Sequence, residues 1–210
     1  ARRNNTRLIH YSTDYVFDGT AKRPYLETDP TNPRSVYGES KLAGERAFEE
    51  SGCKHVILRT SWVYSSHGKN FVLSMLDLAK RDIPLKVVDD QIGCPTSARN
   101  LALATDAVIQ HWQESVSDSS HGVFHYCDDR SLSWCDFARS IFSYSISSGL
   151  LDSMPDLTPV RSSEFPQVAE RPKWSVLDSG KINRSFNIRP VSFEQSLRAV
   201  INEIKTRVKK

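Results

Sequence analysis

The stretch R-L-I-H-Y-S-T-D-Y-V-F, residues 7–17, decides the fold class of this chain. Its apolar start predicts a short buried strand over residues 7–11. After a turn-rich segment, Asn32 and Pro33 predict a helix start, with the asparagine as cap and the proline at the first helical position. This helix should run to about Glu50, and residues 55–59 predict a second apolar strand. The order strand, helix, strand indicates parallel strands joined by a helix.

The same alternation continues to the end of the chain. Further strands are predicted at residues 86–88 and 122–127, and further helices at 70–81, 97–114 and 133–147. A last helix is predicted from Ser192 onward, because Ser192 and Gln195 have the spacing of a capping box. The pattern predicts an α/β chain with a parallel sheet.

Composition and charge exclude several classes of protein. With 28 basic and 25 acidic residues among 210, the net charge is +3, which does not favour nucleic acid as a partner. No apolar run approaches the roughly 18 residues of a membrane helix, so no membrane association is expected. The four cysteines form no C-x-x-C pair, which favours a reducing, cytoplasmic location over a disulfide scaffold. The sequence starts at Ala1, without an initiator Met and without a signal segment, so we expect a fragment of a longer protein.

The segment Y-G-E-S-K places Tyr37 and Lys41 one helical turn apart, on the same face of the predicted helix. A lysine ammonium at this distance stabilises a phenolate and moves a tyrosine pKa toward neutral pH, which suits acid–base work. The spacing alone is weak evidence, since it also fits an ordinary surface helix. Ser12 and Thr13 strengthen it, because they follow a buried strand and the carboxyl ends of parallel strands border the ligand crevice.

Histidines do not add a metal site to this picture. His121 and His125 lie four residues apart on a predicted strand, but the sequence places no third ligand near them. We therefore predict no metal site.

Longer blocks of sequence carry a resemblance to a known family. The chain resembles the extended short-chain dehydrogenases/reductases, and within them the dTDP-4-dehydrorhamnose reductases, over essentially its whole length. The blocks that carry the resemblance are S-T-D-Y-V-F-D-G (12–19), Y-L-E-T-D-P (25–30), Y-G-E-S-K-L-A-G-E (37–45), R-T-S-W-V-Y-S (59–65), G-K-N-F (68–71), D-D-Q-I-G-C-P-T (89–96) and E-R-P-K-W-S-V-L (170–177).

The resemblance implies a fold and a domain arrangement. The fold would be the C-terminal part of a Rossmann-like doubly wound parallel sheet plus a small α/β substrate-binding domain. Residues 1–64 and 97–130 would belong to the nucleotide-binding domain, and residues 65–96 and 131–210 mainly to the substrate-binding domain. The glycine-rich turn with which this family holds the cofactor pyrophosphate has no counterpart in the sequence. We therefore expect the chain alone to be inactive.

The resemblance also implies roles for individual residues. Thr13, Tyr37 and Lys41 would be the catalytic residues. Tyr37 and Lys41 would also contact the cofactor. Beside the nicotinamide the resemblance places Ser12, Ser61 and Val63, and in the substrate pocket it places Thr13, Tyr15, Trp62 and Arg171. Tyr15 and Trp62 also fit ordinary core aromatics, and Arg171 also fits a surface arginine.

The implied reaction is reduction of dTDP-4-dehydro-β-L-rhamnose to dTDP-L-rhamnose, a step toward O-antigen polysaccharide. The implied cofactor is NADPH, with NADH left open, and Mg²⁺ occurs in the family although no residue here can be assigned to it. The partner would be the dTDP-sugar, and a homodimer stays open. The alternatives are a nucleotide-sugar epimerase or dehydratase of the same superfamily, and a non-catalytic regulatory subunit with this fold.

Overall fold

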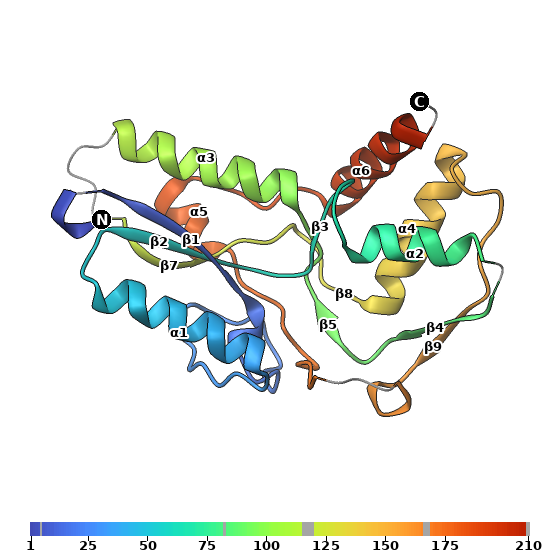
Figure 1. Cartoon of the computed structure of the whole chain (residues 1–210), viewed down its shortest axis with the longest axis horizontal. Coiled ribbons are helices and arrows are strands. Elements are labelled where there is room, and N and C mark those ends of the chain that lie inside the picture. Colours follow the sequence, from blue (N-terminus) through green and yellow to red (C-terminus); the bar gives the residue numbers. More distant parts are fainter. Residues whose placement is uncertain (5, 82, 115–119, 166–168, 209–210) are drawn as a thin grey trace.

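The computed structural model describes residues 1–4, 6–81, 83–114, 120–165 and 169–208. Its first layer is a parallel sheet of three strands, β1 (Leu8–Thr13), β2 (His55–Thr60) and β7 (Gly122–His125), in the order β1-β2-β7. Helix α1 (Val36–Glu50) covers one face of this sheet, and helices α3 (Ala98–Glu114) and α5 (Gly180–Phe186) cover the other (Figure 1). The predicted α/β class with a parallel sheet is confirmed.

Strand β2 forms the centre of the first layer because it is apolar and covered on both faces. All six of its residues are buried, as expected for a strand with helices on both sides of a parallel sheet. Val56 and Leu58 pack with Leu101 and Val108 of α3 and with Ile182 of α5.

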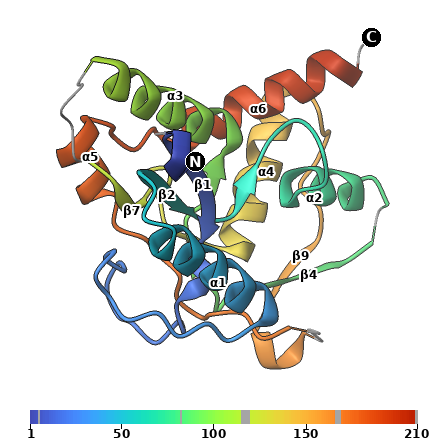
Figure 2. The same cartoon turned by 60° about the vertical axis from the view of Figure 1, so that its left-hand side comes forward.

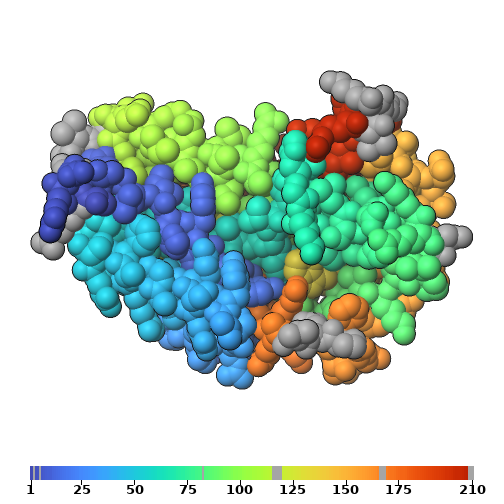
Figure 3. Space-filling model, in the orientation of Figure 1, coloured from blue at the N-terminus to red at the C-terminus, as the bar shows by residue number. Residues whose placement is uncertain are grey.

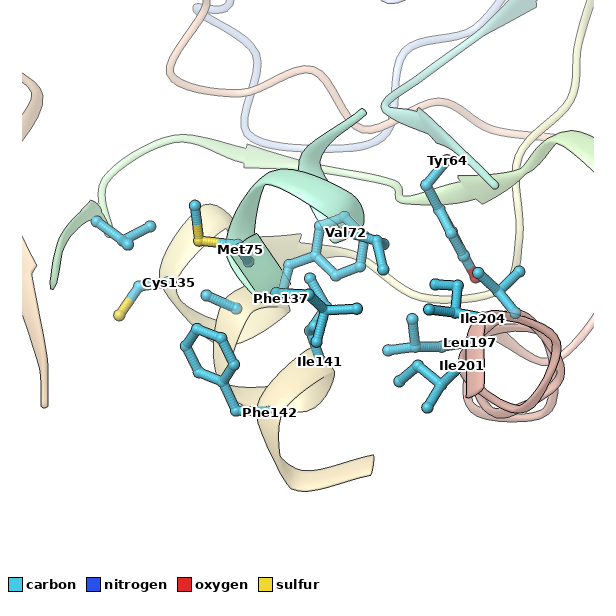
Figure 4. Packing of buried hydrophobic residues seen from close by; sticks show 14 of the residues in the cluster. Tyr64, Val72, Met75, Cys135, Phe137, Ile141, Phe142, Leu197, Ile201 and Ile204 are labelled. Atoms are coloured by element: carbon cyan, nitrogen blue, oxygen red, sulfur yellow. The ribbon is translucent and has the colours of Figure 1, made fainter. Parts of the chain in front are cut away.

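The second layer is built from helices α2 (Phe71–Ala79), α4 (Trp134–Ser148) and α6 (Phe193–Val208). Beside them lies a parallel pair of short strands, β4 (Leu85–Val88) and β9 (Leu157–Val160). Figure 4 shows the core between the three helices, where Val72 and Met75 of α2 meet Phe137 and Ile141 of α4 and Leu197 of α6. This cluster is separate from the core around β2.

Two small strand pairs connect the layers. Strand β3 (Val63–Tyr64) pairs in parallel with β6 (Thr96–Ser97), and β5 (Ile92–Gly93) pairs antiparallel with β8 (Leu132–Ser133). In the rotated view the strands of the first layer lie between α1 and α3, while α2, α4 and the β4–β9 pair lie to one side (Figure 2). The segment that follows β2 therefore leads directly from the sheet into the second layer.

The structure departs from the expected helix start at α1. The helix begins at Val36, and Ser35 is its cap, because the Ser35 hydroxyl accepts from the backbone N–H of Gly38. Asn32, the expected cap, instead donates through its side-chain amide to Asp18 in the preceding turn. The asparagine stabilises the turn, and the helix starts three residues later than expected.

Residues 131–210, expected mainly in the substrate-binding part, include one helix that packs on the first layer. Helix α5 packs on the sheet of the first layer, where Ile182 and Phe186 contact the cluster around β2. Lys181 of α5 also contacts the sheet, because its ammonium lies 4.4 Å from the ring centroid of Phe124 on β7. The apolar face of this short helix is therefore buried against β7.

All four cysteines are buried and free: Cys53, Cys94, Cys127 and Cys135. Among the residues with assigned structure, no helix is long and apolar enough to span a bilayer.

Candidate active site

The site begins at the carboxyl end of β1. The strand ends at Thr13, and a short 3-10 turn, Asp14–Val16, follows it directly. The Thr13 hydroxyl donates to Asp14 Oδ1 at 3.0 Å and accepts from the Tyr15 N–H at 3.2 Å. Ser61, at the end of β2, donates to the other oxygen of Asp14 at 2.8 Å. Burial raises the pKa of Asp14 to about 6, although these hydroxyl donors oppose the shift.

Helix α1 brings Tyr37 and Lys41 to the same end of the sheet. Tyr37 is 54% exposed, and its ring lies edge-on to the Tyr15 ring at a centroid distance of 6.2 Å. The Lys41 ammonium donates to the backbone carbonyl of Tyr11 at 2.6 Å. The structure thus brings Tyr37 beside the turn that follows Thr13, and it anchors Lys41 on the last residues of β1.

Gly38 sets how closely α1 approaches that turn. A Cβ atom at this position would lie 2.2 Å from the Tyr15 carbonyl oxygen and 2.9 Å from Pro33 Cβ. Since real Cβ atoms essentially never approach within 3.0 Å, only glycine permits this packing. Gly38 therefore determines how far Tyr37 stands from Tyr15.

Arg171 reaches the site from the C-terminal part of the chain. Burial raises the pKa of the Tyr15 phenol, and the positive charge of the nearby Arg171 guanidinium opposes the shift. In the space-filling view the blue N-terminal part and the orange segment around residue 170 meet on the lower side of the molecule (Figure 3). Tyr15, Tyr37 and Arg171 therefore form one cluster.

Two cavities share Arg171. One has a volume of about 550 Å³ and a polar wall that includes Arg34, Ser162 and Lys173. The other has a volume of about 480 Å³ and is lined mostly by apolar side chains, among them Trp134. A cationic group between a polar and an apolar cavity suits a ligand with an anionic middle and less polar ends.

Trp62 adopts an unusual conformation at the end of β2. Its φ of 46° lies in the left-handed region, which is uncommon for a large side chain. The indole stacks on Trp134 at a centroid distance of 3.5 Å, and a Cβ on Gly93 would lie 2.4 Å from Trp62 Cε2. Since nothing fits between rings 3.5 Å apart, Gly93 and Trp134 lie on opposite faces of the indole. Both faces of Trp62 are thus covered, and its neighbour Trp134 lines the apolar cavity.

The residues assigned to the nicotinamide side fall into two groups. Val63, on strand β3, is 44% exposed. The hydroxyls of Ser12 and Ser61 are buried and donate to carboxylates, Ser12 to Glu45 and Ser61 to Asp14. Of these side chains, the structure leaves only Val63 substantially exposed to a ligand.

Sequence reasoning missed Asp14, Gly38, Glu45 and Trp134 near this site. An acidic residue on the buried face of the predicted helix was the available signal for Glu45. The contacts of Gly38 and Trp134 depend on tertiary packing. Within the described ranges no group of three or more histidine, cysteine, aspartate or glutamate side chains could hold a metal ion.

Comparison with known proteins agrees with this architecture. The family model described as RmlD substrate binding domain matches residues 1–206. A relative from Aggregatibacter actinomycetemcomitans, named dTDP-4-dehydrorhamnose reductase, is 38% identical over 202 residues, covering 95% of this chain and 68% of the relative. The chain belongs to the dTDP-4-dehydrorhamnose reductase family.

Other members of the dTDP-4-dehydrorhamnose reductase family give a consistent picture. The relative from Sinorhizobium fredii is 44% identical, covering 92% of this chain and 65% of its own length. The crystal structure of dTDP-4-dehydrorhamnose reductase from Bacillus anthracis in complex with NADP aligns with a TM-score of 0.84 and 34% identity, covering 94% of this chain and 66% of that one. The chain therefore spans about two thirds of the length of these relatives.

Proposed function

We propose that the protein containing this chain reduces the 4-keto group of dTDP-4-dehydro-β-L-rhamnose to give dTDP-L-rhamnose, with NADPH as cofactor. The observation that carries the proposal is the exposed Tyr37, held beside Tyr15 and the end of β1 on the helix that also carries Lys41. The names of the relatives, one of them solved with NADP, support the substrate and the cofactor.

Tyr37 is the proposed proton donor. When bound, NADPH supplies the hydride that the carbonyl carbon receives. The Tyr37 O–H gives its proton to the carbonyl oxygen, which becomes the new hydroxyl, and solvent then reprotonates the phenolate. The Lys41 ammonium stabilises that phenolate, and the Lys41 and Tyr37 donors suit the hydroxyls of a cofactor ribose.

Thr13 is proposed to hydrogen-bond the carbonyl oxygen. Thr13 is only 5% exposed, and its hydroxyl donates to Asp14 in this structure. To serve the substrate it would turn from Asp14 toward the ligand. Asp14 keeps the Ser61 donor in that state, so its carboxyl group stays paired.

The cavities at Arg171 are the proposed place of the nucleotide sugar. A diphosphate carries charges that a guanidinium binds well. Arg34 and Lys173 lie in the same polar cavity, together with the carboxylates of Asp18 and Glu170, the latter paired with Arg34. The apolar cavity beside Trp134 suits a flat base or a deoxysugar with a methyl group.

Other activities of the superfamily use similar residues. A dTDP-glucose 4,6-dehydratase structure and a UDP-glucuronic acid 4-epimerase structure align with TM-scores of 0.76 and 0.74, but at 16% and 21% identity they show only a shared fold. Relatives at 38–44% identity favour the reductase over these two activities.

The test is to incubate the natural protein with NADPH and dTDP-4-dehydro-L-rhamnose and to identify the product. We expect dTDP-L-rhamnose, with one NADPH oxidised per sugar reduced. Conversion of the sugar without net oxidation of NADPH would indicate an epimerase or dehydratase, and binding without conversion would indicate a non-catalytic subunit. We further propose a cytoplasmic location, which the four free cysteines support.

A further inference from the structure

Helix α1 buries an acidic side chain where an apolar one would be expected. Its buried residues are Gly38, Leu42 and Glu45, and the Glu45 side chain is only 2% exposed. Glutamate is almost never fully buried unless it is paired. The face that attaches this helix to the sheet thus consists of a glycine, a leucine and a carboxylate.

Glu45 is paired through both of its carboxylate oxygens. Arg59 Nε donates to Oε1 at 2.9 Å, and Arg59 Nη2 donates to Oε2 at 2.6 Å, which is a bidentate arrangement. The buried Ser12 hydroxyl also donates to Oε1. The Arg59 guanidinium lies 5.1 Å from the centroid of the Phe17 ring.

These contacts join three elements at one level of the sheet. Ser12 of β1 and Arg59 of β2 are direct partners in the parallel register, and Glu45 comes from α1. Lys41, one turn before Glu45, holds the Tyr11 carbonyl. Gly38 packs against the Tyr15 carbonyl. Helix α1 is therefore attached to β1 and the turn after it at three successive levels.

We propose that Glu45, Arg59 and Ser12 form a positioning network for Tyr37 and Lys41. This proposal deepens the proposed function and rests on it. The network fixes the rotation and height of α1 against β1, and so places the Tyr37 hydroxyl over the substrate carbonyl. None of its three residues touches the reacting atoms.

Directed polar contacts and undirected apolar contacts constrain a helix differently. A buried ion pair is rarely more stabilising than well-packed apolar residues of similar volume, whereas removing one partner leaves a costly buried charge. Apolar contacts allow a helix to rotate and slide slightly, but a bidentate pair with a third donor holds it in one orientation. The ion pair therefore contributes position more than stability, and an apolar replacement of both partners separates the two contributions.

The main test is the double variant Glu45→Leu with Arg59→Met, in the natural protein. We expect thermal stability close to wild type and a loss of kcat of about 10- to 100-fold, because misplacement by about 1 Å costs on the order of 100-fold. The KM for the nucleotide sugar should change much less than kcat. The matched control is Asp77→Asn with Arg81→Gln, which removes an exposed ion pair of 2.6 Å at the C-terminal end of α2 and should change neither constant.

A second readout does not depend on turnover. The edge-on contact between Tyr15 and Tyr37 shifts their aromatic proton signals, and the Tyr37→Phe variant assigns them. The double variant should lose these shifts while the control keeps them. A folded double variant with wild-type kcat and unchanged ring signals would overturn the proposal.

Two further variants decide the remaining cases. If the double variant does not fold, Arg59→Lys keeps the charge without the bidentate fork, and Ser12→Ala removes the third donor. Each variant should lower kcat and leave KM nearly unchanged. Wild-type kcat in both variants would overturn the proposal. Wild-type protein that does not reduce the keto-sugar would refute the proposed function, while the ring signals would still decide the positioning proposal.

Discussion

Replacing Gly38 with alanine tests whether the distance between α1 and the turn after β1 sets the activity. The added Cβ would lie 2.2 Å from the Tyr15 carbonyl oxygen. The helix must retreat by at least about 0.8 Å before this contact reaches 3.0 Å, the limit that real Cβ atoms observe. A displacement of about 1 Å costs on the order of 100-fold in rate. We therefore expect kcat to fall about 10- to 100-fold.

The control is alanine at Gly44 on the same helix. A Cβ there would lie 3.5 Å from His10 Nε2, an ordinary contact. Higher helix propensity should stabilise both variants by up to about 1 kcal/mol. Only Gly38→Ala is also destabilised by overpacking, which costs about 1–3 kcal/mol. The assay is initial-rate kinetics of keto-sugar reduction in the natural protein, with thermal unfolding in parallel. Equal kcat values for the two variants would refute the reasoning.

Two further predictions address the substrate and the buried carboxylate. Arg171→Met should raise the KM for the nucleotide sugar about 10-fold or more with little change in kcat, since a charge-assisted hydrogen bond contributes about 1.5–3 kcal/mol. Arg189→Met, at an exposed arginine, is the control in the same rate assay. Equal KM values for the two variants would contradict the proposed role of Arg171. Because burial raises the pKa of Asp14 from 3.8 to about 6, the folded state binds its proton more tightly than the unfolded state does. The contribution of Asp14 to the free energy of unfolding should therefore fall, by up to about 3 kcal/mol, as the pH rises from about 4 to 6. Asp14→Asn should remove that part of the pH dependence in urea titrations, and an unchanged difference between pH 4 and pH 7 would show that Asp14 is not its source.

The elements that the sequence predicted best are those with strong periodicity. The strand at residues 55–59 and the helix at 97–114 lie within one residue of β2 and α3. The two-residue strands of β3, β5, β6 and β8 were not predicted, because such short pairs have no periodic pattern. The start of α1 was misplaced, since Asn32 and Ser35 are both good caps and only tertiary contacts decide between them.

In the candidate site, too, local patterns could be predicted from the sequence and tertiary contacts could not. The spacing of Tyr37 and Lys41, four residues apart, can be read from the sequence because one helix turn brings them together. The pairing of Glu45 with Arg59 depends on how α1 crosses the sheet, which no local pattern contains. The stacking of Trp62 on Trp134 likewise joins two segments that are far apart in the sequence. Local spacing therefore indicates that Tyr37 and Lys41, the proposed reacting groups, share one helix face, and tertiary packing determines what holds them.

The proposed carbonyl reduction depends on delivery of a proton by the Tyr37 hydroxyl. Its most direct test is the rate of NADPH oxidation by the natural protein carrying Tyr37→Phe, with saturating dTDP-4-dehydro-L-rhamnose. Tyr144→Phe, on α4 beside Arg198, is the matched control. We predict that kcat falls about 10²- to 10⁴-fold in Tyr37→Phe, while substrate binding and the Tyr144→Phe control stay near wild type. A Tyr37→Phe enzyme with wild-type kcat would contradict the account.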